Sequence, residues 1–326
     1  MNGGSVPAYN GDMSDDRPRP PRRPSAAGGP WKSAPSRERA PHFERGPRPP
    51  RTHDAPAPSR APHDDAWHTT PMDDAPAHPA RARRDTELRL YGLNAVHAVF
   101  ARRPQAIRKL YLLEARIPAV QPLLKWCVAH RVGYRIVEEA DLDRLAASTH
   151  HEGIVADVLR EDPQSVSNWL RDLPAGPQCA LWLDGVGNPH NFGAILRSAA
   201  HFGVSAILLP KHSPLALSGA AARVAEGGAE VVPMVRLGRQ DNALAQLRSA
   251  GFALAATVVK GGSDVFEASL PSRMVFVMGS EGEGMDRELV AACDTRVSIP
   301  GTGAVESLNV AAATAVLLAA WRHRAS

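Results

Sequence analysis

Apolar and polar positions alternate in short blocks from about residue 85 onward, and the period of the pattern changes from block to block. The runs LRLYG, IRKLYLLEA, YRIVEE and GIVADVLR carry the spacing of strands, whereas LNAVHAVFARR, VQPLLKWCVAHRVG and ADLDRLAAS carry that of helices. This alternation predicts a small α/β domain over residues 85–160. A polar connector over residues 161–178 follows, with a helical turn or two in SVSNWLRDL.

A second α/β alternation begins at CALWLDG and continues to the C-terminus, so we expect a second domain over residues 179–326. Nearly continuous apolar strands such as AILLP and MVFVM indicate a parallel sheet that is covered on both faces. The expected strands are residues 179–184, 205–209, 230–235, 252–259, 274–279 and 295–299. The expected helices begin near Asn191, Leu217, Arg239, Met285 and Glu306.

The stretch NPHNFGAILRS predicts a helix with Asn191 as its N-terminal cap. Its apolar face is expected to hold Phe192, Ile195, Leu196, Ala199 and Gly203. At about 100° per residue, Arg197 falls roughly opposite this face. A solvated helix with a routine cap would explain the pattern, and so would a helix that presents an arginine to a cleft.

The first 84 residues differ in composition from the rest of the chain. They contain 17 of the 29 prolines and neither leucine nor isoleucine. Such a segment buries too little apolar surface to offset the entropy of ordering it, so we predict a disordered leader over residues 1–84.

Charge divides at the same point. Residues 1–84 hold 14 Lys and Arg against 10 Asp and Glu, whereas residues 85–326 hold 24 of each sign. Arginines among prolines, as in RPRPPRRP, suit a flexible arm that captures RNA through phosphate contacts. A low-complexity solubilising leader is the alternative, because acidic residues such as Asp64 and Asp65 dilute the positive charge.

The three cysteines predict neither disulfides nor a metal centre, because Cys127, Cys179 and Cys293 are few and widely spaced. The N-terminus has no apolar signal segment, and the alanine-rich last helix carries Asn309 and Thr314, which is typical of a buried core helix. We therefore expect a soluble, cytoplasmic protein without membrane or metal partners.

Three polar loops follow strands of the second domain: DGVGNPHNFGAILR, GSEGEGM over residues 279–285, and SIPGTGAVESLN. Ligands of parallel α/β sheets bind beyond the carboxyl ends of the strands, where these loops are expected. The glycines of GSEGEG suggest a dinucleotide, but the GxxGxG spacing is wrong and Glu281 and Glu283 would repel a pyrophosphate. A neutral or cationic ligand fits better, and a plain acidic turn is the alternative.

In the third loop, Gly301 and Gly303 allow a tight bend before Ser307 and Asn309. Polar side chains at the start of an apolar helix need partners, so these two residues either cap their own helix or contact a ligand.

The segments NPHNFGAILRSA, VMGSEGEGM and SIPGTGAVESLNVAAATA, in this order, resemble the three motifs of the SpoU/TrmH-type (SPOUT superfamily) RNA 2′-O-ribose methyltransferases. The upstream domain is similar to the family's L30e-like RNA substrate-binding domain. The resemblance covers residues 86–326 and implies a C-terminal trefoil knot that holds S-adenosylmethionine, together with a homodimer. It also implies methyl transfer to a ribose 2′-hydroxyl of structured RNA, either rRNA or tRNA.

The resemblance further assigns roles to individual residues. Arg197 is expected to bind the neighbouring phosphate and stabilise the developing alkoxide, since arginine stays charged and is a poor literal base. His190 is expected to be an ordinary loop histidine. The other expected catalytic or substrate-placing residues are Asn191, Glu281, Ser307 and Asn309. The expected cofactor-binding residues, acting largely through backbone groups, are Gly279, Ile299, Leu308 and Thr257.

Two rival functions remain open at this stage. One is an RNA-binding protein that kept the methyltransferase fold but lost catalysis, although the five expected site residues are all present. The other, a nucleotide-dependent oxidoreductase, is disfavoured by the glutamates in the glycine loop.

Overall fold

The computed structural model describes residues 86–280, 282 and 284–325. The predicted disordered leader and the expected site residue Glu281 therefore lie outside the described residues.

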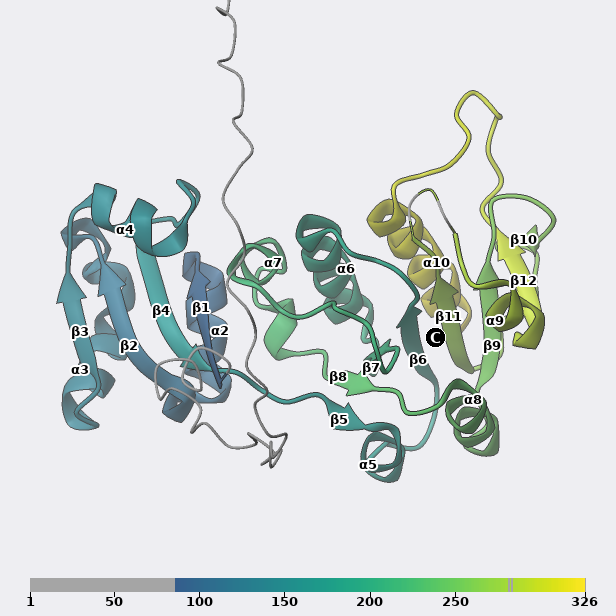
Figure 1. Cartoon of the computed structure of the whole chain (residues 1–326), viewed down its shortest axis with the longest axis horizontal. Helices are drawn as coiled ribbons and strands as arrows, with labels where there is room; N and C mark the ends of the chain where they lie inside the picture. The colour runs from purple at the N-terminus through teal and green to yellow at the C-terminus, as the bar shows by residue number, and fades with distance from the viewer. Residues whose placement is uncertain (1–85, 281, 283, 326) are drawn as a thin grey trace, which may run out of the picture. The chain divides into compact units, whose positions relative to one another are not determined.

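The first part of the described chain forms a four-stranded sheet in the order β1-β4-β2-β3 (Figure 1). β4 pairs antiparallel with both β1 and β2, whereas β3 pairs parallel with β2 and lies at the edge. Alternate apolar residues of the strands, such as Leu110, Leu112 and Ile154, are fully buried. The elements of this part are β1 (Glu87–Tyr91), α2 (Leu93–Arg102), η1 (Pro104–Ala106), β2 (Ile107–Leu112), η2 (Glu114–Arg116), η3 (Pro118–Val120), α3 (Gln121–Ala129), β3 (Gly133–Ile136), α4 (Glu139–Ala146) and β4 (Ile154–Leu159).

The second part forms an eight-stranded sheet in the order β10-β12-β9-β11-β6-β7-β8-β5, and every neighbouring pair of strands is parallel. This arrangement confirms the predicted parallel sheet. Its strands are β5 (Gln164–Ser165), β6 (Gln178–Leu183), β7 (Ala206–Leu209), β8 (Met234–Arg236), β9 (Ala253–Thr257), β10 (Ser263–Asp264), β11 (Arg273–Met278) and β12 (Thr295–Ser298). Its helices are α5 (Val166–Arg171), α6 (Pro189–Phe202), α7 (Gly219–Val224), η4 (Gly228–Glu230), α8 (Gln240–Ser249), α9 (Arg287–Ala292) and α10 (Val310–Ala325).

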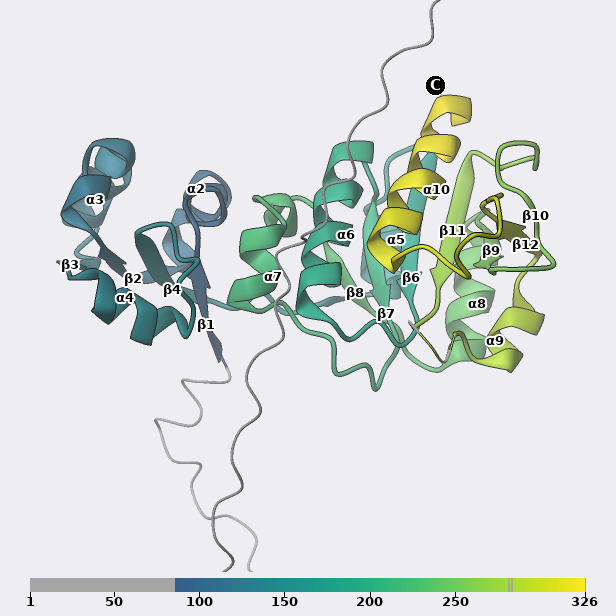
Figure 2. The same cartoon turned by 90° about the horizontal axis from the view of Figure 1, so that it is seen from above.

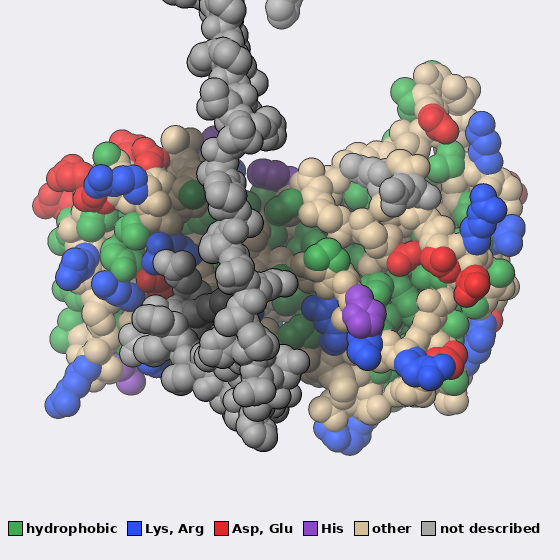
Figure 3. Space-filling view, in the orientation of Figure 1, with side chains coloured by type: hydrophobic (Ala, Val, Ile, Leu, Met, Phe, Trp, Pro, Cys, Tyr) green, Lys and Arg blue, Asp and Glu red, His purple; other side chains and the backbone are tan. Residues whose placement is uncertain are grey.

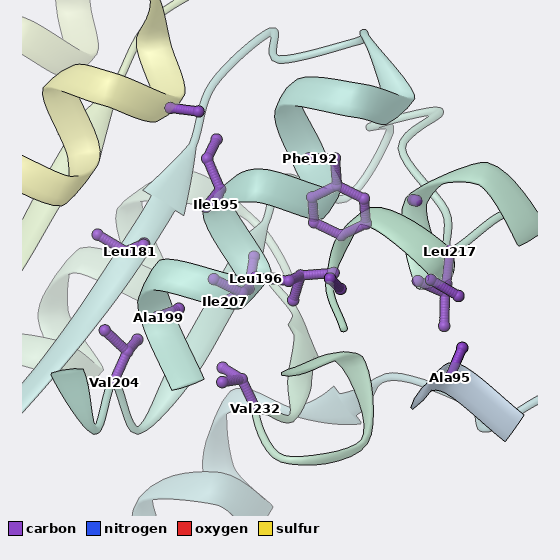
Figure 4. Close-up of a cluster of buried hydrophobic side chains, with 14 of the residues drawn as sticks. Ala95, Leu181, Phe192, Ile195, Leu196, Ala199, Val204, Ile207, Leu217 and Val232 are labelled. Atoms are coloured by element: carbon purple, nitrogen blue, oxygen red, sulfur yellow. The ribbon is translucent and has the colours of Figure 1, made fainter. Parts of the chain in front are cut away.

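Apolar side chains cover both faces of the larger sheet, which explains why the six residues of β6 are all buried. Leu181 packs in one cluster with residues of α6, α7 and α10, while Trp182 packs in a second cluster with residues of α5, α8 and α9. α7, α6 and α10 lie side by side on the first face (Figures 1 and 2). The expected apolar face of α6 is confirmed for Phe192, Ile195, Leu196 and Ala199, which Figure 4 shows in the first cluster.

Several element boundaries differ from the prediction. Gly203 does not belong to the apolar face of α6, since it is exposed and ends the helix with a left-handed φ of 73°. The strand expected over residues 230–235 is shorter and later, because η4 packs against α6 so tightly that a Cβ on Gly228 would lie 2.7 Å from the Leu196 carbonyl oxygen. The last helix begins at Val310 and not near Glu306, because residues 300–309 form an exposed loop.

The segment expected as a connector adds the edge strand β5 to the larger sheet, and it also forms α5, whose Trp169 is buried against one face of that sheet. The last helix is a core helix as expected, because Leu318 and Trp321 are buried and Thr314 donates a hydrogen bond to the Val310 carbonyl oxygen at 2.7 Å. Within the described part of the chain, no helix combines the length and apolar character needed to cross a membrane.

Candidate active site

The start of α6 is organised by Asn188 and not by Asn191. The Asn188 side-chain oxygen accepts hydrogen bonds from the backbone N–H groups of His190 (2.8 Å) and Asn191 (3.4 Å), and Pro189 occupies the first helical position. Proline suits that position because its φ is already helical and it has no N–H to satisfy. The predicted cap at Asn191 is therefore wrong by three residues, and the Asn191 side chain is not used as a cap.

The first and third motifs meet through two asparagines. Asn309 Nδ2 donates a hydrogen bond to Asn191 Oδ1 at 3.0 Å. Asn309 Oδ1 accepts from the backbone N–H groups of Ala311 (3.0 Å) and Ala312 (3.4 Å), so the same amide caps α10. Of the two roles left open for Asn309, the structure shows the cap and adds a link between α6 and α10.

The glycine of the first motif allows α6 and α7 to pack closely. A Cβ on Gly193 would lie 2.5 Å from the Ala221 carbonyl oxygen and 2.7 Å from Val224 Cβ, closer than real side chains approach. The motif thus gathers a capped start, a packing glycine and an outward arginine in fewer than three helical turns.

Arg197 lies on a different side of α6 from Asn191. Six residues along a helix correspond to a rise of about 9 Å and a rotation of about 240°. The Arg197 side chain is 65% exposed, which confirms its place off the apolar face, and its Nη1 atom lies 4.0 Å from Glu226 Oε1. The described chain therefore does not bring Arg197 to Asn191 and Asn309.

The second motif folds into a tight turn. The backbone groups of Ser280 and Gly284 bond to each other in both directions, at 2.9 and 3.2 Å. Gly282 and Gly284 have φ of 98° and 78°, a region that glycine enters without a steric penalty. Glu281 and Glu283 lie outside the described residues, so the placement of the expected site residue Glu281 stays a prediction.

A pair of aspartates connects the first two loops, and the sequence analysis did not single them out. The Asp286 backbone N–H donates to Asp184 Oδ2 at 3.0 Å, and Asp286 Oδ1 accepts from the Leu289 N–H at 2.9 Å as the cap of α9. The sequence signal was available, because Asp184 directly follows an apolar strand and Asp286 directly precedes a helix.

The expected cofactor-binding residues divide into two sets. Thr257, Gly279 and Ile299 follow or end β9, β11 and β12, which are neighbours in the sheet, so they meet at one edge. The Thr257 hydroxyl donates to the Val277 carbonyl oxygen at 2.8 Å and is thus engaged within the sheet. Leu308, 48% exposed, and Ser307 lie instead in the exposed loop between β12 and α10, which projects in yellow in Figure 1.

Two pockets flank α6. The smaller one, about 180 Å³, lies where the three loops approach one another and is lined by Gly185, Val186, Gly187, Asn188, Asn191, Ser280 and Val310. The larger one, about 490 Å³, is more open and includes Arg197 and Glu226 together with Asn94 and Ala98 of α2.

The thiols of the second domain are unsuited to nucleophilic chemistry at neutral pH. Burial raises the pKa of the Cys293 thiol to about 11, with a further contribution from Asp294, and burial also raises the pKa of Cys179. Among residues 86–280, 282 and 284–325, no group of three or more His, Cys, Asp or Glu side chains could hold a metal ion.

Comparison with known proteins identifies the family. Residues 178–319 match the model of the SpoU rRNA Methylase family, and residues 89–164 match that of the RNA 2′-O ribose methyltransferase substrate binding domain. The chain is 37% identical to an uncharacterized tRNA/rRNA methyltransferase, YfiF, of Escherichia coli O157:H7, covering 95% of this chain and 92% of that protein.

It is 35% identical to the 23S rRNA (guanosine-2′-O-)-methyltransferase RlmB of Salmonella typhimurium, covering 70% of this chain and 95% of that protein. An AdoMet-bound rRNA methyltransferase from Sinorhizobium meliloti shares the fold, with a TM-score of 0.62 and 24% identity over 76% of this chain and 91% of that one. The chain thus belongs to the SpoU rRNA methylase family of RNA methyltransferases.

Proposed function

We propose that this protein transfers a methyl group from S-adenosylmethionine to a ribose 2′-hydroxyl of structured RNA. The observation that carries the proposal is the Asn191–Asn309 hydrogen bond, which joins the first and third family motifs beside a pocket at the carboxyl edge of a parallel sheet. The relative RlmB is named for 2′-O-methylation of guanosine in 23S rRNA, and the similarity covers 70% of this chain.

The cofactor site we propose lies at the ends of β9, β11 and β12. Residues 300–309 are exposed, so their backbone groups are available to a ligand, and Ile299 and Leu308 offer apolar surface beside them. This mixture suits a neutral adenosine and a cationic sulfonium better than a pyrophosphate. S-adenosylmethionine supplies the reactive methyl group when bound; Gly279, Ile299, Leu308 and Thr257 hold and orient it.

The 2′-hydroxyl is a weak nucleophile at neutral pH, so its developing negative charge needs stabilisation. Arg197 supplies a permanent charge with five N–H donors, which can contact a neighbouring phosphate and the developing alkoxide. Asn191, Ser307 and Asn309 shape the pocket that receives the nucleotide, and Glu281 orders the second loop.

Because Arg197 and Asn191 face different pockets of one chain, we propose that the active site is completed in a homodimer. Mixing an Arg197→Ala chain with an Asn309→Ala chain tests this arrangement, since mixed dimers would regain one intact site. We expect an equal mixture to recover about a quarter of the wild-type activity, because random exchange makes about half of the dimers mixed and each mixed dimer has one intact site of two. A mixture that stays as inactive as its components, with exchange verified, would mean that each chain works alone.

RNA is expected to approach away from α4. Figure 3 shows acidic side chains gathered over that helix, where Glu138 and Glu139 are exposed and Asp141 is half-buried. A polyanion avoids such a surface. The arginine-rich leader is proposed to add non-specific RNA affinity in the cytoplasm, so its removal should flatten the salt dependence of RNA binding and leave cofactor affinity unchanged.

The experiment that tests the function is methyl incorporation into rRNA and tRNA purified from cells that lack the gene, followed by mapping of ribose methylation. Calorimetric titration with S-adenosylmethionine separates the proposal from the alternative of an inactive RNA-binding protein. Cofactor binding with site-specific ribose methylation supports the enzyme. RNA binding without cofactor binding supports the inactive protein.

A further inference from the structure

Glu226, in the turn that follows α7, faces side chains from two other elements. Asn94 of α2 donates a hydrogen bond from Nδ2 to Glu226 Oε2, and Arg197 Nη1 of α6 lies 4.0 Å from Glu226 Oε1. The Glu226 side chain is 29% exposed. One carboxylate thus connects the candidate catalytic arginine with the first helix of the substrate-binding domain.

The backbone at Glu226 is in a conformation that glutamate rarely adopts. Its φ of 52° lies in the left-handed region, where a Cβ is disfavoured and glycine carries no such penalty. The next two residues, Gly227 and Gly228, are glycines. Backbone geometry alone would therefore favour glycine at position 226 as well. The side-chain contacts with Asn94 and Arg197 explain why glutamate is present instead.

The Arg197–Glu226 ion pair orients the arginine side chain without using its N–H groups in hydrogen bonds. At 4.0 Å the pair is too long for a hydrogen bond, and no acceptor within the described part of the chain bonds to the Arg197 guanidinium. An exposed ion pair of this kind contributes little to stability. It does bias a long, rotamer-rich side chain toward one direction and leaves the five N–H groups available to RNA.

We propose that Glu226 is a positioning residue for Arg197, an inference that rests on the function proposed above. Glu226 holds the guanidinium at the larger pocket, beside Ala98 and Ala200. Because Asn94 of α2 donates a hydrogen bond to Glu226, the position of the Arg197 guanidinium depends on the position of α2. The Glu226 carboxylate thus couples the substrate-binding domain, which holds RNA, to the catalytic arginine.

Glu152 provides a matched control. It also has a left-handed φ, of 55°, and it also joins the two parts of the chain: it accepts from the Leu93 N–H at 2.9 Å and pairs with Arg223 of α7 at 3.2 Å. Within the described residues, Glu152 forms neither a hydrogen bond nor an ion pair with Arg197.

The test compares Glu226→Gln, Glu226→Gly and Glu152→Gln in the full chain. Initial rates are measured with purified rRNA and tRNA from cells lacking the gene, at saturating S-adenosylmethionine and varied RNA. We expect both Glu226 variants to lower kcat about tenfold, because misplacing a catalytic group by a fraction of an ångström is costly, with little change in KM for RNA. Glu152→Gln should stay within about twofold of wild type.

Two further results separate positioning from a structural role. Glu226→Gly should keep the wild-type Tm to within a few degrees while losing kcat, because glycine suits the backbone. Glu226→Gln should have no additional effect in an Arg197→Ala background, since Glu226 acts through Arg197.

Normal or raised kcat in both Glu226 variants, with Arg197→Ala inactive, would overturn the positioning role and leave the proposed function standing. An additional loss in the Arg197→Ala background would overturn it as well. Full activity of Arg197→Ala itself would instead overturn the role on which the proposal rests.

Discussion

The start and the middle of helix α6 carry residues of the same motif, but they are built differently. At the start, Asn188 caps the helix, Asn191 bonds to Asn309, and Gly193 packs against α7. Four residues after that glycine, Arg197 extends into solvent with one long ion pair. We propose that the first residues of the motif fix the helix in place and that Arg197 acts on the substrate, and the predictions below test this division.

The largest effect is expected for Arg197→Ala, and on activity alone. Removing one preorganised charged group should lower methyl transfer about a hundredfold or more. The free energy of unfolding should change by less than about 0.5 kcal/mol, because the side chain is exposed. Turnover measurements and urea denaturation on the same preparation test the two statements together.

Arg197→Lys sharpens that result. Lysine keeps the charge but loses the planar, forked arrangement of donors, so we expect the variant to stay largely inactive. Recovery of most of the activity would mean that charge alone is sufficient at this position.

Gly193→Ala should act on stability. The added methyl group meets the backbone and Val224 of α7, so we expect a loss of about 1–3 kcal/mol in the free energy of unfolding. Gly238→Ala is the matched control, because no atom lies within 4 Å of a Cβ there, and it should be nearly neutral. Equal stability of the two variants would contradict the close packing of α6 on α7.

Asn309→Ala should cost about 1–2 kcal/mol, since it removes the cap of α10 and the bond to α6 together. A double-mutant cycle with Asn191→Ala isolates the bond itself, with an expected coupling of about 1 kcal/mol. Strict additivity in urea denaturation would show that the two motifs are not energetically linked.

The smallest effect is expected for Asn188→Ala, about 1 kcal/mol for a lost N-terminal cap. His190→Ala, at an exposed neighbouring position, should be neutral in both stability and turnover. Thermal unfolding resolves the difference, and a comparable loss from the histidine variant would argue against the interpretation of His190 as an ordinary residue.

The fold class and the parallel sheet could be predicted from the sequence because strands buried on both faces, such as β6 and β11, are continuous apolar runs. The strands β5 and β10 could not be predicted, since a strand of two residues shows no periodic pattern of apolar and polar positions. The cap was misplaced because Asn188 and Asn191 both satisfy the residue preference, and only Pro189 distinguishes them. The knot depends on how the chain threads, which no local pattern encodes, so it stays a prediction of the family resemblance.

The candidate site was predictable in outline only. Thr257, Gly279 and Ile299 lie at one edge because β9, β11 and β12 are neighbours in the sheet. Strand order depends on contacts between distant parts of the chain, so local sequence patterns could not predict this arrangement. The separation of Arg197 from Asn191 follows from helix geometry and could have been derived. The contact between Arg197 and Glu226 could not be derived, because it depends on how α7 and η4 pack against α6.

The larger sheet ends in two very short strands, β10 on one side and β5 on the other, each two residues long. A long exposed edge offers unpaired N–H and C=O groups to any passing strand, and short edges are a common protection against aggregation. This sheet therefore offers a second chain almost no backbone for strand addition. If two copies associate through this part of the protein, we expect them to meet through helix or loop surfaces and not through an extended sheet that continues from one molecule into the next.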